Sequence, residues 1–380
     1  MKRKVAAPER MVLLSVVLLI TAGLIFIYSV SGPFSQALGL SDWHYFIRQA
    51  LWAILALTVL FISSLIDYHK LLKISPLFIL LALSLLIIVL FAPAKQNVHR
   101  WLEIGPIQLQ PSEIFKVSLI MFLAFSLARE KARFSERKKV IAKLAIISFG
   151  LLLVAKQPDL GTLTVIFSVT VALLFLVGVK FRYLFLGALV VAAVGSVIVF
   201  GIGYEKDRIT DYFAILQDPL ADANRTGLKG GFYQVQQSLI SIGSGGLLGR
   251  GLGVGGQKNL FLPAPHTDFI FSSSSEEGGL ILGAFVLSMF LLFIWGSLKV
   301  AQQAGDMEGF LLAAGLGLLV AIQAAINIGV ATGLLPVTGI TLPFFSYGGS
   351  SLVICCAAVG LILSVARHDQ GSQVNYLMVR

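Results

Sequence analysis

The stretch MVLLSVVLLITAGLIFIYSV, residues 11–30, carries no charged side chain. A helix of about 20 mainly apolar residues is long enough to cross the hydrocarbon core of a bilayer. The run follows a basic start, MKRK and Arg10, but it is longer than the apolar core of a signal peptide, and no small-residue cleavage site ends it. We therefore expect this run to stay in the protein as a membrane-spanning helix.

The rest of the chain repeats this pattern. Of its 380 residues, 57% are hydrophobic and 13% are charged, and the charged share is about half that of a typical soluble domain. The pattern predicts an all-α integral membrane protein of about ten transmembrane helices, a single polytopic domain over residues 1–380. The spans are expected to begin near Met11, Phe46, Ser75, Ser112, Val140, Leu160, Tyr183, Phe269, Gly309 and Phe345.

The basic residues predict the orientation, because cytoplasmic segments of membrane proteins carry an excess of lysine and arginine. With the N-terminus in the cytoplasm, 18 of the 29 lysines and arginines fall on the cytoplasmic side. Six of the other 11 lie in one long loop, and the rule largely discounts long loops, so the comparison is 18 against five. The expected topology is N-in and C-in.

Residues 204–268 form the only long extracytoplasmic loop of this topology. About 65 structureless residues are improbable in a compact protein unless they carry function. Within the loop, the segment 229–242 has apolar residues near helical spacing, such as Phe232, Val235 and Leu239. We expect a short helix lying on the outer membrane surface there.

Several functions are disfavoured by the sequence. The net charge of +10 does not indicate a nucleic-acid partner, because no basic run is interleaved with aromatic residues. Cys355 and Cys356 are adjacent within an apolar run and fit neither a normal disulfide nor a metal-binding spacing. The glycine-rich run 243–258 contains a formal GxGxxG, but no strand precedes it, so it predicts flexible backbone rather than a nucleotide site.

The outer connection HRWLEIGPIQLQPSEIFK, residues 99–116, holds the first group of candidate residues. Glu113 and Lys116 are three positions apart on one helical face and could pair within the membrane or at its interface. Trp101 fits a substrate contact or an interfacial anchor, and Arg100 fits a phosphate contact or a solvent-facing charge. The residues alone leave these alternatives open.

Two later stretches hold the second group. LPAPHTDFIF, residues 262–271, puts Asp268 at the mouth of an apolar span, and Glu276 and Glu277 follow it by about two turns. PVTGITLPFFSYGGSS, residues 336–351, predicts irregular backbone packed at membrane depth. Gln323 and Asn327, within a span, are expected to face the interior and to form hydrogen bonds between helices.

These stretches, HRWLEIG with QPSEIFK, LPAPHTDFIF and GITLPFFSYGGSS, resemble the SEDS family, whose members act in shape, elongation, division and sporulation. The resemblance covers essentially the whole chain, and the region 233–271 with GITLP looks more like the division (FtsW) branch than the elongation (RodA) branch. One departure is SSSSEEGG, residues 272–279, where the family usually carries small apolar residues before the acidic pair.

The resemblance implies a peptidoglycan glycosyltransferase of the bacterial cytoplasmic (inner) membrane, with its active site on the extracytoplasmic face. Its substrates would be lipid II and the nascent glycan chain. Its expected partners are a class B penicillin-binding protein, which is a transpeptidase, and other division proteins. An elongation polymerase, a lipid II flippase or transporter, and an assembly scaffold for division partners are the alternatives.

The family's essential aspartate falls on Asp268, its outer tryptophan on Trp101, and its acidic and basic pair on Glu113 and Lys116. An inverting displacement needs a base, for which Asp268 is the candidate, and stabilisation of the departing pyrophosphate. Arg100, Lys116 and Lys258 are candidates for that second role, alone or with a divalent cation such as Mg²⁺ or Mn²⁺. Further expected substrate contacts are His266, Thr267, Ser346, Gly348 and Gly349.

Overall fold

A computed structural model describes the chain over residues 7–93, 98–105, 107–129, 137–157, 159–185, 187, 189, 206–217, 230–256, 262–263 and 265–368. Within these residues, seven helices are long and apolar enough to cross a membrane. They are α1 (Pro8–Ala37), α2 (His44–Leu65), α5 (Pro111–Ala128), α7 (Leu160–Val177), α12 (Ile270–Gln303), α13 (Met307–Ala331) and α14 (Gly349–His368). Two shorter apolar helices, α4 (Ser75–Leu90) and part of α6 (Arg137–Ala155), accompany them.

Nine of the ten expected spans begin within four residues of a described helix. The seventh, expected near Tyr183, falls largely outside the described residues. The helix expected in the long loop is confirmed as α11 (Gly231–Gly245). Four small elements were not expected: the short helix α3 (Tyr68–Lys73), the helix α9 (Lys206–Gln217) in the long loop, and the antiparallel strands β1 (Leu102–Ile104) and β2 (Ile107–Leu109).

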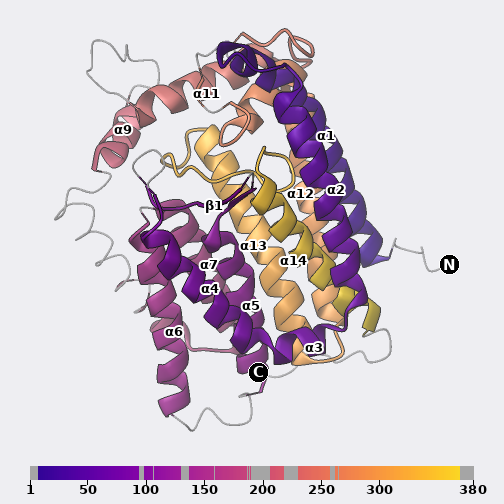
Figure 1. Cartoon of the computed structure of the whole chain (residues 1–380), viewed down its shortest axis with the longest axis vertical. Helices are drawn as coiled ribbons and strands as arrows, with labels where there is room; N and C mark the ends of the chain where they lie inside the picture. Colours follow the sequence, from indigo (N-terminus) through magenta and orange to yellow (C-terminus); the bar gives the residue numbers. More distant parts are fainter. Residues whose placement is uncertain are drawn as a thin grey trace.

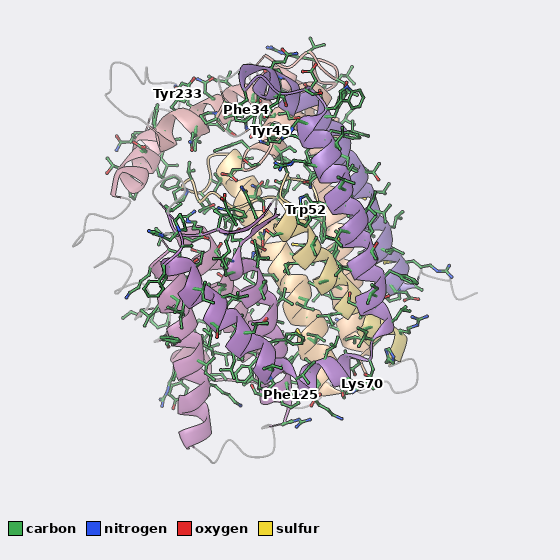
Figure 2. All side chains as sticks on the ribbon, viewed as in Figure 1. Phe34, Tyr45, Trp52, Lys70, Phe125 and Tyr233 are labelled. Carbon is green, nitrogen blue, oxygen red and sulfur yellow. The ribbon has the colours of Figure 1, made fainter. Side chains whose placement is uncertain are left out.

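The helices form one bundle, with α9 and α11 lying across one end and the short α3 (Tyr68–Lys73) at the other (Figure 1). Of the seven long helices, α5 and α13 are the most buried, with 72% of the best apolar window of each inside the bundle. Polar side chains on these two helices are therefore shielded from lipid by neighbouring helices. Figure 2 shows Phe34 and Tyr45 near the α11 end of the bundle and Lys70 and Phe125 near the α3 end.

The helix α12 is interrupted at Gly279, whose φ of 66° and ψ of −166° are not helical. A Cβ atom on Gly283 would lie 3.8 Å from the hydroxyl of Ser275. In an unbroken helix, eight residues would separate these positions by about 12 Å. The chain therefore turns sharply at Gly279, and residues 270–278 form a separate helical arm that precedes the main span.

The glycine-rich loop, residues 246–256, covers this turn. The amides of Arg250 and Gly251 donate to the carbonyls of Glu276 and Glu277 at 3.0 Å each, and the amide of Leu280 donates to the carbonyl of Gly246 at 2.9 Å. These bonds satisfy backbone groups that the broken helix leaves without partners. The glycines, expected from the sequence to make the backbone flexible, thus allow the backbone of this loop to pack closely against the backbone of the turn.

Both acidic side chains before the turn are buried and bound. The carboxylate of Glu276 accepts from the amide of Gly256 at 2.8 Å and from Nη1 of Arg250 at 3.4 Å. The carboxylate of Glu277 accepts from the hydroxyl of Ser29 on α1 at 2.5 Å. Glu276 and Glu277 therefore have a structural role, because they bind the glycine-rich loop and α1 to the turn.

Replacing Gly279 should strongly destabilise the fold. A Cβ atom there would lie 2.3 Å from the amide nitrogen of Gly249, and this backbone conformation, which is essentially restricted to glycine, costs an L-residue about 1–3 kcal/mol before any clash. We expect Gly279→Ala to lower the unfolding temperature of the detergent-solubilised protein by several degrees. Gly32→Ala on α1, where a Cβ would meet nothing within 4 Å, is the control, and equal unfolding temperatures for both variants would contradict this account of the turn.

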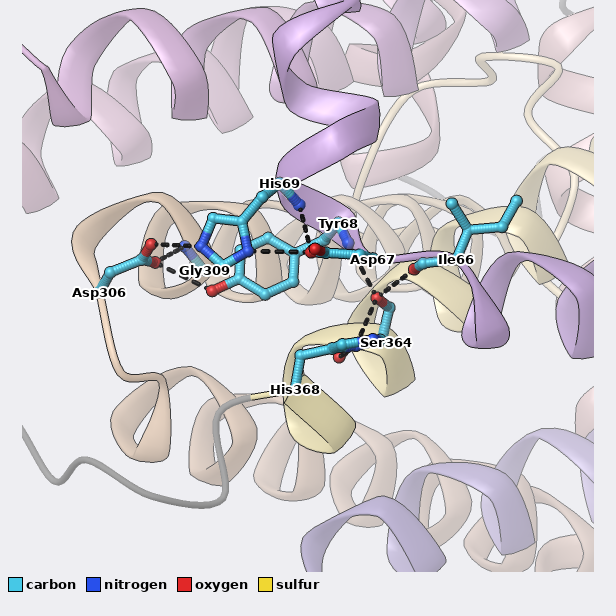
Figure 3. A network of polar contacts seen from close by, with 8 residues as sticks. All are labelled: Ile66, Asp67, Tyr68, His69, Asp306, Gly309, Ser364 and His368. Atoms are coloured by element: carbon cyan, nitrogen blue, oxygen red, sulfur yellow. Dashed lines mark hydrogen bonds and ion pairs between the residues drawn. The ribbon is translucent and has the colours of Figure 1, made fainter.

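At the α3 end, a polar clamp joins three helices (Figure 3). The imidazole of His69 faces the carboxylate of Asp67 at 2.9 Å through Nδ1 and that of Asp306 at 2.8 Å through Nε2. Asp306 also accepts from the amide of Gly309 at 2.7 Å, which caps α13, and Ser364 on α14 donates to the carbonyl of Ile66 at 2.6 Å. The clamp therefore fixes the α2–α3 connection against α13 and α14.

The clamp makes stability dependent on pH. Burial alone would lower the pKa of His69, but its hydrogen bonds to Asp306 and Asp67 outweigh burial and raise that pKa above its usual 6.5. A raised pKa means that the histidine stabilises the fold fully below pH 6.5, and that this contribution is lost as the pH rises through the folded-state pKa.

We therefore expect His69→Gln to lower the unfolding temperature more at pH 5.5 than at pH 9, as measured by thermal unfolding in detergent. His44→Gln, at the opposite end of α2 and outside the clamp, serves as the control for replacing a histidine with glutamine. An equal loss for His69→Gln at both pH values would contradict a charged His69.

Candidate functional site

Asp268 lies in a short turn, the aspartate loop (residues 265–269), immediately before α12. Its side chain is half-buried and approaches the backbone at Gly339, where a Cβ atom would lie 3.8 Å from Oδ2. Gly339 has a φ of 69°, in the left-handed region that favours glycine. The close approach and the backbone conformation both suit glycine at this position.

The aspartate loop is held through three consecutive carbonyl groups. The carbonyl of His266 accepts from the amide of Tyr347 at 2.9 Å, and the carbonyl of Thr267 accepts from the hydroxyl of Ser346 at 2.7 Å. The carbonyl of Asp268 accepts from Nδ2 of Asn327 at 2.8 Å. The backbone that carries the aspartate is thus fixed at every residue from 266 to 268.

The partner of this loop is the return loop (residues 336–348), which leads into α14. Its backbone is strained at Phe344, a bulky residue with a φ of 64°, and such conformations cost about 1–3 kcal/mol and gather at functional sites. The amide of Gln49 on α2 clamps the loop, donating to the carbonyl of Ser346 and accepting from the amide of Gly348, both at 3.2 Å. Gly349 begins α14 against Trp52, whose ring a Cβ would meet at 2.3 Å.

His266 sits in an aromatic box made by Phe34 of α1, Tyr45 of α2 and Tyr347. The ring centroids lie 5.0, 4.7 and 5.5 Å from that of the imidazole. Burial lowers the pKa of His266 to about 4, so the imidazole is neutral at physiological pH. Among the described residues its Nδ1 has no hydrogen-bond partner. The structure therefore places His266 as a packed, uncharged neighbour of Asp268.

The predicted pairing of Glu113 with Lys116 is confirmed. Nζ of Lys116 lies 2.8 Å from Oε1 of Glu113, and the side chains of Lys116 and Glu113 are 2% and 6% exposed, respectively. The same Nζ donates to Oε1 of Gln323 on α13 at 2.7 Å. This ammonium is therefore bound by protein groups inside the bundle, instead of projecting from it toward a ligand.

Arg100 and Trp101 lie on the hairpin that contains β1 and β2, and both are half-buried. Nε of Arg100 donates to the carbonyl of Gln157 at 2.9 Å, which ties the hairpin to the turn before α7. In the same turn Asp159 caps α7 and accepts from Gln110 at 3.3 Å. Strand β2 packs near α14, so the hairpin lies beside the helix that the return loop leads into.

The expected site residues thus fall into separate groups. The structure brings the segment His266–Asp268 against the segment Ser346–Gly348, because the hydroxyl of Ser346 and the amide of Tyr347 donate to the carbonyls of residues 267 and 266. Glu113 and Lys116 form a buried pair, and Arg100 and Trp101 belong to the hairpin. Lys258 lies outside the described residues.

Residues that the sequence did not single out complete the site. Arg48 is exposed on α2 and lies near the phenol of Tyr347, and Gln49 beside it clamps the return loop. The available signal was a polar pair within an otherwise apolar span, which usually faces the protein interior or a cavity. Neither Tyr45 nor Tyr347 stood out, because aromatic residues are common near membrane interfaces.

A metal site was expected only as an accessory. No group of three or more His, Cys, Asp and Glu side chains that could hold a metal ion occurs among the described residues.

Comparisons with known proteins agree with this architecture. The model of the cell cycle protein family of FtsW, RodA and SpoVE matches residues 9–371. Stage V sporulation protein E of Bacillus subtilis is 37% identical over 376 residues, covering 97% of this chain and 100% of that protein. A probable peptidoglycan glycosyltransferase FtsW of Geobacter metallireducens is 34% identical over 369 residues, covering 96% of each.

Solved structures show the same fold. A chain from a peptidoglycan synthase complex, described as coordinating polymerization and crosslinking, matches with a TM-score of 0.74 and 28% identity over 95% of this chain and 98% of that one. The rod shape determining protein RodA of Thermus thermophilus matches with a TM-score of 0.70 and 24% identity over 96% of this chain and 98% of that one.

Proposed function

This chain belongs to the FtsW, RodA and SpoVE family, and on that premise we propose that it is a peptidoglycan glycosyltransferase that polymerises lipid II. The observation that carries the proposal is the fixed aspartate loop. Asp268 is half-buried, its backbone is held at three consecutive carbonyls, and its side chain approaches the strained return loop. A general base requires this kind of preorganisation.

The chemistry follows from the bond that is made. The donor sugar is α-linked to pyrophosphate and the product is β-1,4-linked, so one displacement with inversion is sufficient. Asp268 takes the proton of the acceptor hydroxyl while that oxygen attacks the anomeric carbon. The bond from this carbon to the phosphate oxygen breaks, and its electron pair leaves with the pyrophosphate.

The leaving pyrophosphate needs positive charge. We assign this part to the cations of the outer face: Arg48 beside Tyr347, Arg100 on the hairpin, and Lys258. Arginine suits it because its guanidinium can bind a phosphate through two parallel hydrogen bonds. Trp101 and the loop residues Thr267, Ser346, Gly348 and Gly349 would contact the sugars, and a divalent cation would act only as an addition to these residues.

The proposed setting is the bacterial cytoplasmic membrane, with ten spans, both termini inside, and residues 204–268 as an outer loop within a single polytopic domain. The α3 end supports this orientation, because it carries Lys70 and Lys73, whereas α11 and Asp268 belong to the long loop at the other end. Lipid II would then reach Asp268 from the outer leaflet. A class B penicillin-binding protein would crosslink the product, and the SpoVE and FtsW relatives favour division or sporulation over elongation.

A transporter or flippase would need polar groups continuing across the bilayer. On α13 the polar side chains Gln323 and Asn327 lie in the half nearer the return loop, whereas residues 309–320 are GFLLAAGLGLLV, without a polar side chain. This asymmetry favours chemistry at one face. The test is to supply labelled lipid II to the detergent-solubilised protein, alone and with a co-purified transpeptidase, since detergent leaves no compartments to transport between. We expect glycan strands to form. The proposal would be overturned if lipid II were consumed neither by the protein alone nor by the protein with the transpeptidase.

A further inference from the structure

The buried ion pair and the aspartate loop are connected by hydrogen bonds at both ends of one face of α13. Lys116 donates to Glu113 at 2.8 Å and to Gln323 at 2.7 Å, and the Nδ2 of Asn327 donates to the carbonyl of Asp268 at 2.8 Å. Gln323 and Asn327 are four positions apart on α13 and therefore share one face of that helix. This face lies between α5 and the two loops of the site.

Both amides also hold the return loop, at neighbouring residues. Nε2 of Gln323 donates to the carbonyl of Thr341 at 3.2 Å, and Nδ2 of Asn327 donates to the carbonyl of Ile340 at 2.7 Å. The two donor bonds of Asn327 thus join the return loop and the aspartate loop to each other at a single nitrogen.

The other side of the return loop is equally constrained. Gly161, in the first turn of α7, packs so closely that a Cβ atom would lie 2.6 Å from Cγ1 of Ile340. Residue 340 is therefore held between α7 and α13. Close-packed interiors transmit strain. A small displacement of α13 would therefore also move Gly339 and the carboxylate of Asp268 beside it.

The burial of the Lys116–Glu113 pair decides whether the pair contacts the substrate or supports the helices around the site. Lys116 is 3% exposed, Glu113 is 4% exposed, and Gln323 and Asn327 are each 1% exposed. A pyrophosphate could reach the ammonium only by displacing Glu113 or Gln323 from it, which would leave a buried polar group without its partner. Contact with the substrate is therefore a poor explanation for this pair.

We propose that Gln323 and Asn327 are positioning residues for the glycosyl transfer, and that the Lys116–Glu113 pair acts through them by fixing α13 against α5. The inference rests on the proposed function for its kinetic part, since it assigns how the base is held. Asn327 has the larger effect, because it contacts the residue that carries the base. Gln323, one helical turn from Asn327 on α13, holds the return loop at Thr341.

The test is the variant Asn327→Leu, which keeps the size of the side chain and removes both donor bonds. A displacement of about 1 Å at a reacting group costs roughly 100-fold in rate, so we expect kcat for lipid II polymerisation to fall about 10- to 100-fold while KM changes less than about threefold. We also expect the acidic limb of the pH profile of kcat/KM to shift, because the surroundings of Asp268 change. Gln323→Leu should show the same pattern with a smaller loss.

The control is Ser364→Ala, which removes hydrogen bonds of an equally buried side chain at the α3 end. It should leave kcat, KM and the pH profile within about twofold of the parent. If the activity lost by Asn327→Leu only follows the loss of folded protein, with KM and the pH profile unchanged, Asn327 is merely structural and the proposal is overturned. Unchanged kinetics would overturn it as well.

A second measurement does not depend on activity. Hydrogen–deuterium exchange in detergent should be faster in peptides covering residues 265–269 and 338–342 of Asn327→Leu than in the parent, and unchanged there in Ser364→Ala. Equal exchange in all three proteins would refute the anchoring. If the parent forms no glycan, the proposed function fails while this comparison still decides whether Asn327 anchors the two loops.

Discussion

The variant Asp268→Asn should lose polymerisation of lipid II almost completely while remaining folded. The substitution is nearly isosteric, and the bonds that hold residues 266–268 go to backbone carbonyls, which the change leaves intact. An amide cannot take the proton of the acceptor hydroxyl, and loss of a general base typically costs about 100- to 10,000-fold in rate. The measurement is glycan formation from labelled lipid II by equal amounts of purified protein.

The control for this prediction is Asp42→Asn. Asp42 is exposed in the connection between α1 and α2, at the same end of the bundle, so the variant makes the same change in charge without touching the aspartate loop. It should polymerise at the rate of the parent. Full activity in Asp268→Asn would remove the aspartate from the mechanism. If growth of cells carrying this variant were also normal, the hypothesis of an assembly scaffold for division partners would be favoured.

The variant Lys116→Met should be among the most destabilising substitutions in the chain. It removes the ammonium from a pair that is almost fully buried and leaves Glu113 as an uncompensated charge inside the bundle. Breaking one partner of a buried pair costs about 3–5 kcal/mol. The measurement is the free energy of unfolding in detergent, obtained from denaturant titration.

Two further variants separate the charge effect from packing. The double variant Glu113→Gln with Lys116→Met should recover most of the lost stability, because no buried charge remains without a partner. Arg129→Met breaks the ion pair of Arg129 with Glu308, in which the arginine is 53% exposed, so it should cost less than about 1 kcal/mol. Similar losses for Lys116→Met and Arg129→Met would mean that burial does not set the energy of the inner pair.

Most of the helical architecture was accessible from the sequence because a bilayer imposes one simple rule. An apolar run such as residues 11–30 must become a helix, since unpaired backbone groups are costly in lipid. The pairing of Glu113 with Lys116 followed from helical spacing in the same way. Both predictions depend on residues close together in the chain, for which periodicity is sufficient.

The turn at Gly279 and the hairpin at residues 102–109 were not predicted, for related reasons. Glycines within an apolar run do not reveal a break whose freed backbone groups are satisfied by a loop some thirty residues earlier in the chain. Strands of three residues are too short for an alternating pattern to stand out. In both cases tertiary contacts outweigh the local signal.

The inner organisation of the site was also beyond the sequence. Gln323 lies 207 positions from Lys116 in the chain, and Gln49 lies 297 positions from Ser346. No local pattern connects such residues. The sequence marked LPAPHTDFIF and PVTGITLPFFSYGGSS as unusual, and the fold shows that these two stretches contact each other through the carbonyls of residues 266 and 267.

The central claim, that this chain makes a glycan by inverting transfer at Asp268, is tested most directly by the linkage of the product. Labelled lipid II is incubated with the detergent-solubilised protein and a co-purified class B transpeptidase, and the polymer is digested with a muramidase that cleaves only β-1,4 bonds. The account predicts a polymer that this muramidase converts fully to disaccharide units and that Asp268→Asn does not form. A polymer that resists the muramidase, or equal polymer from Asp268→Asn, would contradict it.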